Sequence, residues 1–298
     1  MAEIAIRTVT PTQRAQRLPP IRWGRVVIYA VLTLGLFQAL LPFLWMLSAS
    51  LMSFTEVTAG RLLPSVPLFS NYQEAWQRAN FAQFVWNSTR ITFITVAGQL
   101  LFCIPAAYAF ARVRFFGRDV LFGIMLATLM IPDVVTLVPN YLTVIWLGRL
   151  SESLFGFGWV NNWPALTIPF MASAFTIFLL RQFFRQIPDD LWDAARIDGA
   201  GHLHFLWSVV IPLSRPAIMT AITFAMIGSW NALLWPLLVT QTDEWRPIAV
   251  GLTKFAASDA PTQLHLQMAA SVIMIVPVLV MYFFTQRQFV ENISINKG

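Results

Sequence analysis

The sequence predicts an all-α integral membrane protein with six transmembrane helices. Hydrophobic residues make up 57% of the chain and charged residues only 11%, whereas a soluble domain carries about 25% charged residues. The apolar residues also fall into blocks long enough for a helix to cross about 30 Å of hydrocarbon. Strands of a membrane barrel would be about ten residues long with strict alternation, and these blocks show neither feature.

The six expected spans follow the chain in order. The first window, 26–55, is too long for the apolar part of a signal peptide, so we expect a retained helix. An even number of spans places both termini on the same side. Five windows are free of charge and one contains only Asp133: 26–55, 91–111, 120–148 with Asp133 inside it, 153–180, 216–242 and 260–286.

The orientation is predicted from the distribution of Lys and Arg. Fourteen of these residues lie before the first span, after the second, after the fourth and after the sixth, against six in the alternate loops. Because positive residues accumulate on the cytoplasmic side, segment 1–25, loop 181–214 and tail 287–298 are expected in the cytoplasm, around a membrane domain of residues 26–286. This asymmetry accounts for the net charge of +6 without a basic nucleic-acid-binding domain.

We expect no catalytic residue and no metal site. Cys103 lies inside the second span, where a small buried hydrophobe is the simplest interpretation. His202, His204 and His265 have no partner at metal-ligand spacing, and the H-E-x-x-H pattern is absent.

Two polar groups of residues interrupt the apolar windows. In "LMIPDVVTLVPNY", Asp133 and Asn140 lie at membrane depth or near its outer edge, and a carboxylate there is a candidate for the transport path. The alternative is that Asp133 meets water at the outer interface. In "SWNALLWP", Trp230 and Asn231 are candidates for contacts with a sugar, and the alternative for Asn231 is a hydrogen bond that joins two helices.

The outer segment 53–86 suggests a short helix at the membrane interface. Its aromatic residues favour that depth in any membrane protein, so they indicate either anchoring or a surface for an external partner. The residues concerned are Tyr72, Glu74, Trp76, Arg78, Phe81 and Phe84.

The loop "DDLWDAARIDGAGHLHFLWSVVIPL" predicts a short helix, a turn and a second helix. Pro188 is expected at the first helical position, with two aspartates in the first turn, and Gly199 is expected to end the helix. The second helix is expected to end before Pro212. Residues Leu191, Ala194, Ala195 and Asp198 share one thin face, which suits either a groove on a partner or the protein's own loops.

This loop resembles the EAA signature of permease subunits of bacterial ABC importers: E-A-A, three residues, Gly, nine residues, I-x-L-P. Asp replaces Glu, Val replaces Ile, and Ile replaces Leu. The phrases "FLLRQFFRQIPDD" and "SWNALLWPL" resemble the carbohydrate-uptake branch, and the similarity runs from about residue 20 to the end, although the tail phrase "ENISIN" departs from it. The matching positions are Asp193, Ala194, Ala195, Gly199, Val209, Ile211 and Pro212.

The resemblance implies the fold of a type I ABC importer permease in the bacterial inner membrane. It implies a second permease subunit, two cytoplasmic ATPase subunits and an external solute-binding protein, with 188–205 as the coupling region. The chain lacks the G-x-x-x-x-G-K-[ST] motif, so ATP and magnesium are expected in the ATPase and no cofactor in this chain. The expected cargo is a sugar or a sugar-like solute.

Three other interpretations stay open from the residues alone. A secondary transporter would show internal repeats and paired ionisable residues at the midplane, and we find no repeat at half length. A membrane enzyme would need clustered catalytic groups at one face. An ABC permease for a non-sugar solute differs only in cargo.

Overall fold

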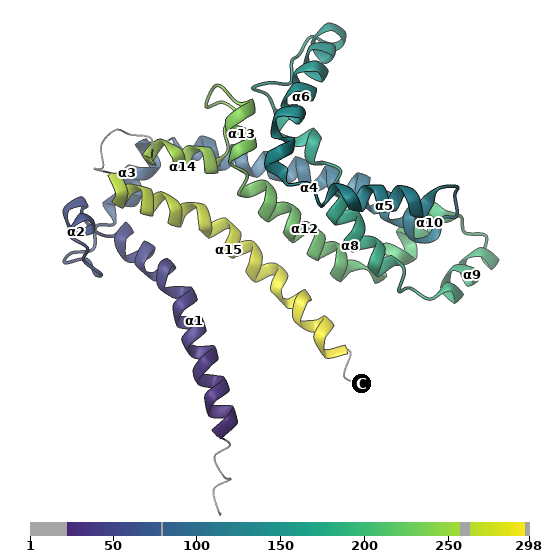
Figure 1. The fold of residues 1–298 in the computed structure, drawn as a ribbon, viewed down its shortest axis with the longest axis horizontal. Helices are drawn as coiled ribbons and strands as arrows, with labels where there is room; N and C mark the ends of the chain where they lie inside the picture. The colour runs from purple at the N-terminus through teal and green to yellow at the C-terminus, as the bar shows by residue number, and fades with distance from the viewer. Residues whose placement is uncertain (1–22, 79, 257–262, 296–298) are drawn as a thin grey trace, which may run out of the picture. The chain divides into compact units, whose positions relative to one another are not determined.

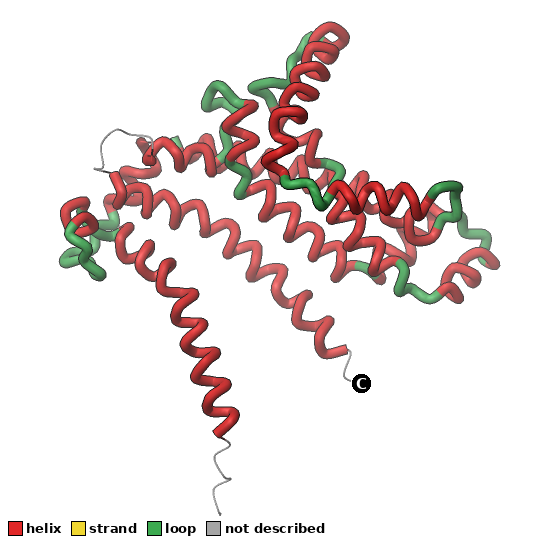
Figure 2. Tube along the Cα trace, viewed as in Figure 1, coloured by secondary structure: helices red, strands yellow, loops and turns green. Residues whose placement is uncertain are grey.

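The computed structural model describes residues 23–78, 80–256 and 263–295, and in these residues it contains only helices and connecting loops (Figures 1 and 2). The chain divides into two compact units, 1–45 and 46–298. The described part of the first unit is most of helix α1 (Trp23–Ser50). Residues Val27–Ser50 have a mean hydropathy of 2.1, and large apolar side chains such as Leu34 and Phe37 are exposed. These properties fit a helix that faces lipid.

The second unit is built around helices α4, α12 and α15. Helix α4 packs against α8 and α12, and α15 packs against α3, α12 and α14. Figure 1 shows α8 and α12 following the course of α4. The helices of this unit are α2 (Phe54–Thr58), α3 (Ser70–Arg78), α4 (Phe81–Arg112), α5 (Arg118–Thr128), α6 (Asp133–Phe155), α7 (Trp163–Thr167), η1 (Ile168–Phe170), α8 (Ala174–Phe184), α9 (Asp189–Ile197), α10 (His202–Phe205), the π-helical η2 (Leu206–Val210), α11 (Ile211–Leu213), α12 (Arg215–Trp230), α13 (Leu234–Val239), α14 (Ile248–Ala256) and α15 (Leu264–Ile295).

Small residues let the helices and loops of this unit approach one another closely. A Cβ atom on Gly98 of α4 would lie 2.3 Å from Cγ of Met171, and one on Gly251 of α14 would lie 2.3 Å from a ring carbon of Phe84. Such contacts are typical of helices packed in membranes. A larger residue at either position would force the Met171 or Phe84 side chain, or the segment that carries it, to shift.

The described helices do not establish the six spans that the sequence predicts. By length and composition, four described helical segments can cross a membrane: Val27–Ser50, Phe81–Arg112, Asp133–Phe155 and Trp163–Phe184. A fifth arises if His202–Leu213 and Arg215–Trp230, bent by 81°, form one span. The apolar part of α15, Leu264–Val280, is shorter. The all-helical membrane class is therefore confirmed, and the count of six is not established.

The structure corrects several predicted boundaries. The window 120–148 is not one helix, because the chain breaks at 129–132 and Pro132, which has no N–H to continue a helix, precedes α6. The window 216–242 also breaks, between α12 and α13. The last helix continues to Ile295, so the helix includes part of the predicted tail 287–298, whose cytoplasmic location stays a prediction. Most of segment 1–25 lies outside the described residues.

The outer segment contributes more to packing than the sequence suggests. Phe81 and Phe84 are fully buried, and Phe81 stacks against Phe255 with ring centroids 6.1 Å apart. Tyr72 shares a 2.6 Å hydrogen bond with the hydroxyl of Ser50. Of the predicted aromatic stripe, Trp76 is the exposed member, at 40%.

Candidate functional site

The first candidate site is the helical loop between α8 and α12. Helix α9 begins at Asp189, and Pro188 lies before it with an extended ψ of 142°. The predicted position of Pro188 as the first helical residue is therefore wrong by one residue. Asp189 and Asp190 occupy the first turn, where carboxylates interact favourably with the positive end of the helix dipole.

Helix α9 is terminated by a Schellman motif in which Gly199 follows the C-cap residue Asp198. Gly199 has a φ of +80°, which glycine adopts without the steric cost that a Cβ brings. The amide of Ala200 donates to the carbonyl of Ala195 at 2.8 Å, and the amide of Gly199 donates to that of Arg196 at 3.0 Å. These two bonds fix the direction in which the chain leaves the helix.

The second half of the loop does not end before Pro212. Helix α10 runs into a π-helical turn, Leu206–Val210, and α11 carries Pro212 at its start. A π-turn has wider i→i+5 spacing, which accommodates a proline ring that would clash with the carbonyl four residues earlier in an α-helix. The whole segment then meets α12 at 81°.

An aromatic and histidine cluster holds the two halves of the loop together. The indole of Trp192 on α9 stacks on the ring of His202 with centroids 4.4 Å apart and an interplanar angle of 16°. The His202 Nδ1 shares a 2.9 Å hydrogen bond with the hydroxyl of Tyr108 on α4. Trp192 also meets buried Phe205 edge-on at 5.0 Å. Helix α9 is thereby tied to the end of α4.

Two arginines cap each other's helices beside this cluster. Arg112, at the end of α4, donates from Nε to the carbonyl of Phe184 at 3.1 Å, and its terminal nitrogens contact the carbonyl of Ile187 and the carboxylate of Asp189. In return, Arg181 of α8 donates from Nε to the carbonyl of Phe110 at 3.1 Å. Each cation therefore binds carbonyl groups where the other helix ends, where positive charge is favoured.

The environment of Arg181 reinforces this arrangement. Its guanidinium lies 3.8 Å from the centroid of the Phe122 ring on α5 and 3.8 Å from a carboxylate oxygen of Asp119. The side chain is only 7% exposed. Arg112 and Arg181 are also two of the positive residues from which the orientation is predicted. Their positions directly after the second and the fourth predicted apolar windows were the signal that could have identified their capping role.

The predicted contact residues of the loop do not all face outward. Ala194 is exposed, whereas Ala195 packs partly against the protein's own core beside Trp192. Three large apolar side chains are unexpectedly exposed next to them, namely Ile197 at 87%, Leu203 at 72% and Trp207 at 63%. Among the remaining predicted residues, Asp193, Asp198, Gly199 and Pro212 are exposed, and Val209 is half-buried against the core.

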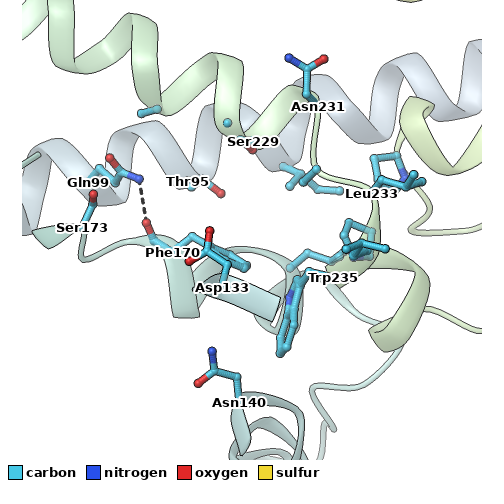
Figure 3. Close-up of a pocket in the computed structure, with 18 of the residues that line it drawn as sticks. Thr95, Gln99, Asp133, Asn140, Phe170, Ser173, Ser229, Asn231, Leu233 and Trp235 are labelled. Atoms are coloured by element: carbon cyan, nitrogen blue, oxygen red, sulfur yellow. Dashed lines mark hydrogen bonds between the residues drawn. The ribbon is translucent and has the colours of Figure 1, made fainter. Parts of the chain in front are cut away.

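The second candidate site is a cavity of about 670 Å³ between α4, α6, α8, α12 and α13 (Figure 3). Three predicted path residues line it: Asp133, Asn140 and Asn231. In the view of Figure 3, the Asp133 carboxylate lies beside Phe170, with Asn140 below it and Asn231 above it. Asp133 and Asn140 are seven residues apart on α6 and so share one face of the helix.

The wall of the cavity is ordered by hydrogen bonds that sequence reasoning did not find. The side-chain amide of Gln99 donates to the carbonyl of Phe170 at 2.9 Å, and its oxygen accepts from the hydroxyl of Thr176 at 3.0 Å. The indole of Trp235 donates to the carbonyl of Ala165 at 2.8 Å. The bonds of Gln99 hold the chain from η1 to α8 against α4, and the bond of Trp235 holds α13 against α7.

Trp230 does not line the cavity with Asn231. It is 3% exposed, and its indole nitrogen donates to the carbonyl of Met274 on α15 at 3.1 Å. Asn231 caps the C-terminal end of α12, where its backbone N–H donates to the carbonyl of Ile227 at 3.1 Å. The side chains of these neighbours therefore have separate surroundings, and Trp230 joins α12 to α15.

A bundle of long apolar helices with a largely apolar cavity between them that holds a few polar side chains, and a capped helical loop at one end, defines a membrane transport permease. The chain belongs to the family of binding-protein-dependent transport system inner membrane components, whose profile matches residues 99–294. It is a permease subunit of the ABC importer type, and the resemblance read from the EAA-like residues is confirmed.

Similar proteins support this assignment over almost the whole chain. The sn-glycerol-3-phosphate transport system permease protein UgpE of Brucella suis biovar 1 is 32% identical, over 91% of this chain and 96% of that protein. The protein of the same name from Yersinia enterocolitica serotype O:8 is 31% identical, over 90% and 95%. A chain of a bacterial ABC transporter involved in the import of the acidic polysaccharide alginate is 29% identical with a TM-score of 0.78, over 89% and 96%.

Proposed function

We propose that this chain forms half of the translocation path of an ATP-driven importer for a sugar or a sugar-like solute. The cargo class is supported by the similar permeases for sn-glycerol-3-phosphate and for alginate. The observation that carries the proposal in this molecule is the cavity at the start of α6, in which the polar side chains of Asp133, Asn140 and Asn231 line a largely apolar wall. Hydroxyl groups of a solute can bond to carboxylate and amide side chains there.

The partners of the proposed importer are a second permease subunit, two cytoplasmic ATPase subunits and an external solute-binding protein. In this arrangement the chain spans the bacterial inner membrane. Both termini and the loop 181–214 lie on its cytoplasmic side. ATP and magnesium bind to the ATPase subunits, and this chain performs no hydrolysis. The exposed large apolar residues on the loop, Ile197, Leu203 and Trp207, are the surface that an ATPase would cover.

In the proposed mechanism, α9 is the coupling helix. Its position relative to α4 and α8 is held by Arg112 and by the Trp192–His202–Tyr108 contacts, so a displacement of α9 by the ATPase would move those spans with it. ATP and the loaded binding protein must both prefer the same state of the path for import to be driven.

The test is uptake by proteoliposomes that contain the assembled importer. We expect uptake of the solute carried by the binding protein to need ATP inside, the ATPase subunits and both permeases. ATP-independent uptake by vesicles that contain this chain alone would instead indicate a secondary transporter and would contradict the proposal.

A further inference from the structure

The lining of the cavity has an unusual charge for a path that carries anions. Of the described residues that line it, one is an acid and none is Lys or Arg. Its remaining polar members are uncharged hydroxyl and amide side chains. The polar lining residues are Thr95, Gln99, Asp133, Thr136, Asn140, Ser173, Thr176, Ser229 and Asn231.

The carboxylate of Asp133 is not neutralised within the described part of the chain. No Lys, Arg or His side chain there lies within ion-pair distance of it. Arg90, which precedes lining residue Ile91, lies over the Trp245 ring at 3.7 Å and donates to Asn87 at 2.6 Å. Arg246, which precedes lining residue Pro247, pairs with Asp243 at 3.2 Å. The two arginines that adjoin lining residues along the chain therefore form contacts with other groups.

A buried hydroxyl in the same wall also lacks a partner. Thr95 is 2% exposed, and within the residues that the structure describes its Oγ1 forms no hydrogen bond. Threonine hydroxyls in helices commonly bond to the carbonyl four residues earlier, as Thr220 and Thr223 do at 2.9 and 2.8 Å. An unsatisfied buried hydroxyl calls for a partner that the chain itself does not supply.

We propose that this chain's share of the path selects a neutral, hydroxyl-rich solute and disfavours an anionic one, with Asp133 as the charge-selecting residue and Thr95 as a hydrogen-bonding residue. The Asp133 carboxylate accepts hydrogen bonds from solute hydroxyls, and the Thr95 hydroxyl can donate or accept. An anionic solute would instead be repelled by the like charge of this carboxylate, which is exposed. This inference rests on the proposed function and narrows its cargo, since glycerol phosphate and alginate are both anionic.

A purely structural role for Asp133 makes a different prediction. As the first residue of α6, its carboxylate is favoured by the helix dipole whatever the solute is. Replacement by Asn would then affect folding of α6 but not the preference for one solute charge over another. The ratio of the binding constants for a neutral and an anionic solute therefore separates the two roles.

The experiment compares two trisaccharides of the same length, neutral maltotriose and anionic trigalacturonate. Equilibrium dialysis measures their binding to the assembled importer in detergent, without the binding protein and with the ATPase sites closed by ADP–vanadate. We expect the wild type to prefer maltotriose. Asp133→Asn should reduce that preference by about tenfold or more. Repulsion between two unit charges about 8 Å apart, at an effective dielectric constant of about 20, is large enough for a change of that size. Glu152→Gln removes a charge from the same helix outside the cavity lining and should leave the preference unchanged.

Thr95 provides a second, independent variant. Thr95→Val removes a hydroxyl that has no partner in the chain, so thermal stability should not fall, while binding of maltotriose should weaken several-fold. Thr92→Val is the matched control, because Thr92 is also buried with an unpartnered Oγ1 but lies outside the lining.

Four results would overturn the charge proposal: no wild-type preference, a preference for trigalacturonate, an unchanged preference in Asp133→Asn, or no binding of either probe at millimolar concentration. ATP-dependent uptake with the loaded binding protein is measured in parallel. If uptake persists while the preference is insensitive to Asp133, the importer function stands and only the selectivity inference fails. If uptake itself is absent, the function fails as well.

Discussion

Removing the Arg112 side chain should loosen the loop much more than removing its ionic partner. The side chain is only 10% exposed, and it binds the carbonyls of Phe184 and Ile187 as well as Asp189. A buried carbonyl that loses its donor costs about 1–3 kcal/mol. Because some water reaches this site, we expect Arg112→Ala to lower the free energy of opening of the loop by about 2–4 kcal/mol from the two carbonyls together.

The ion pair contributes little to that figure. Asp189 is 87% exposed, and ion pairs with an exposed partner are worth about 0–1 kcal/mol. Asp189→Asn should therefore lower the free energy of opening by less than about 1 kcal/mol. Arg112→Lys should fall between the two variants, because an ammonium group cannot reproduce the fork of the guanidinium.

Hydrogen exchange of the peptide covering 185–200, in the assembled importer, measures loop opening directly. A decrease of about 2–4 kcal/mol in the free energy of opening corresponds to exchange roughly 30-fold to several hundred-fold faster. ATP hydrolysis stimulated by loaded binding protein should fall in parallel. Arg185→Ala removes an exposed charge nearby and serves as the control. If Asp189→Asn accelerated exchange as much as Arg112→Ala, the ion pair and not the capping of the carbonyls would hold the loop.

Three further predictions concern the ends of the loop and the outer segment. Gly199→Val should abolish most of the stimulated ATP hydrolysis, because the φ of +80° at this position costs a β-branched residue about 1–2 kcal/mol. Gly201→Val, at an ordinary φ of −86°, should leave the stimulated hydrolysis unchanged. Equal effects of the two substitutions would contradict the reasoning. Tyr108→Phe should weaken the hold on His202 and raise exchange in α10 while leaving that of α14 unchanged; unaltered exchange in α10 would show that stacking on Trp192 suffices. The Ser65 hydroxyl and the Ser53 and Ser65 amides lower the pKa of Glu56 to about 2, so its stabilisation of segment 53–65 should be complete above about pH 4.5 and be lost as pH falls toward 2. Glu56→Gln should therefore accelerate exchange of this segment at pH 7, by a margin that shrinks below pH 4.5; a margin independent of pH would refute the role of the carboxylate.

Much of the fold could be predicted from the sequence, because membrane-spanning helices are recognisable from their apolar composition. Long charge-poor windows and the Pro188-to-Gly199 pattern predicted helical segments and the end of α9 correctly, since both depend on local chemistry. The breaks at 129–132 and after Trp230 were missed because an apolar window does not show where a helix bends. Pro132 was visible in the sequence but was read as part of one span.

The site depended on contacts between distant residues that spacing does not encode. The reciprocal arrangement of Arg112 and Arg181 requires α4 and α8 to end side by side, and the stacking of Trp192 on His202 requires the loop to fold back on itself. The cavity likewise combines α6 with α4 and α12. Asp133 and Asn231 were found because polar residues in apolar windows are conspicuous, whereas Thr95 was not, since a threonine in a span is unremarkable until its hydroxyl proves to have no partner.

The central claim is that α9 is the surface through which this permease meets its ATPase. The most direct test uses Ala194→Cys in a Cys103→Ser background, because Cys103 is the chain's single cysteine and Ala194 is exposed on α9. A short thiol-to-amine crosslinker applied to the assembled importer should join Ala194→Cys to the ATPase subunit, with a yield that changes when ADP–vanadate is added. Leu63→Cys, in the exposed loop between α2 and α3, should give no such product. Crosslinking to the ATPase from Leu63→Cys but not from Ala194→Cys would contradict the account.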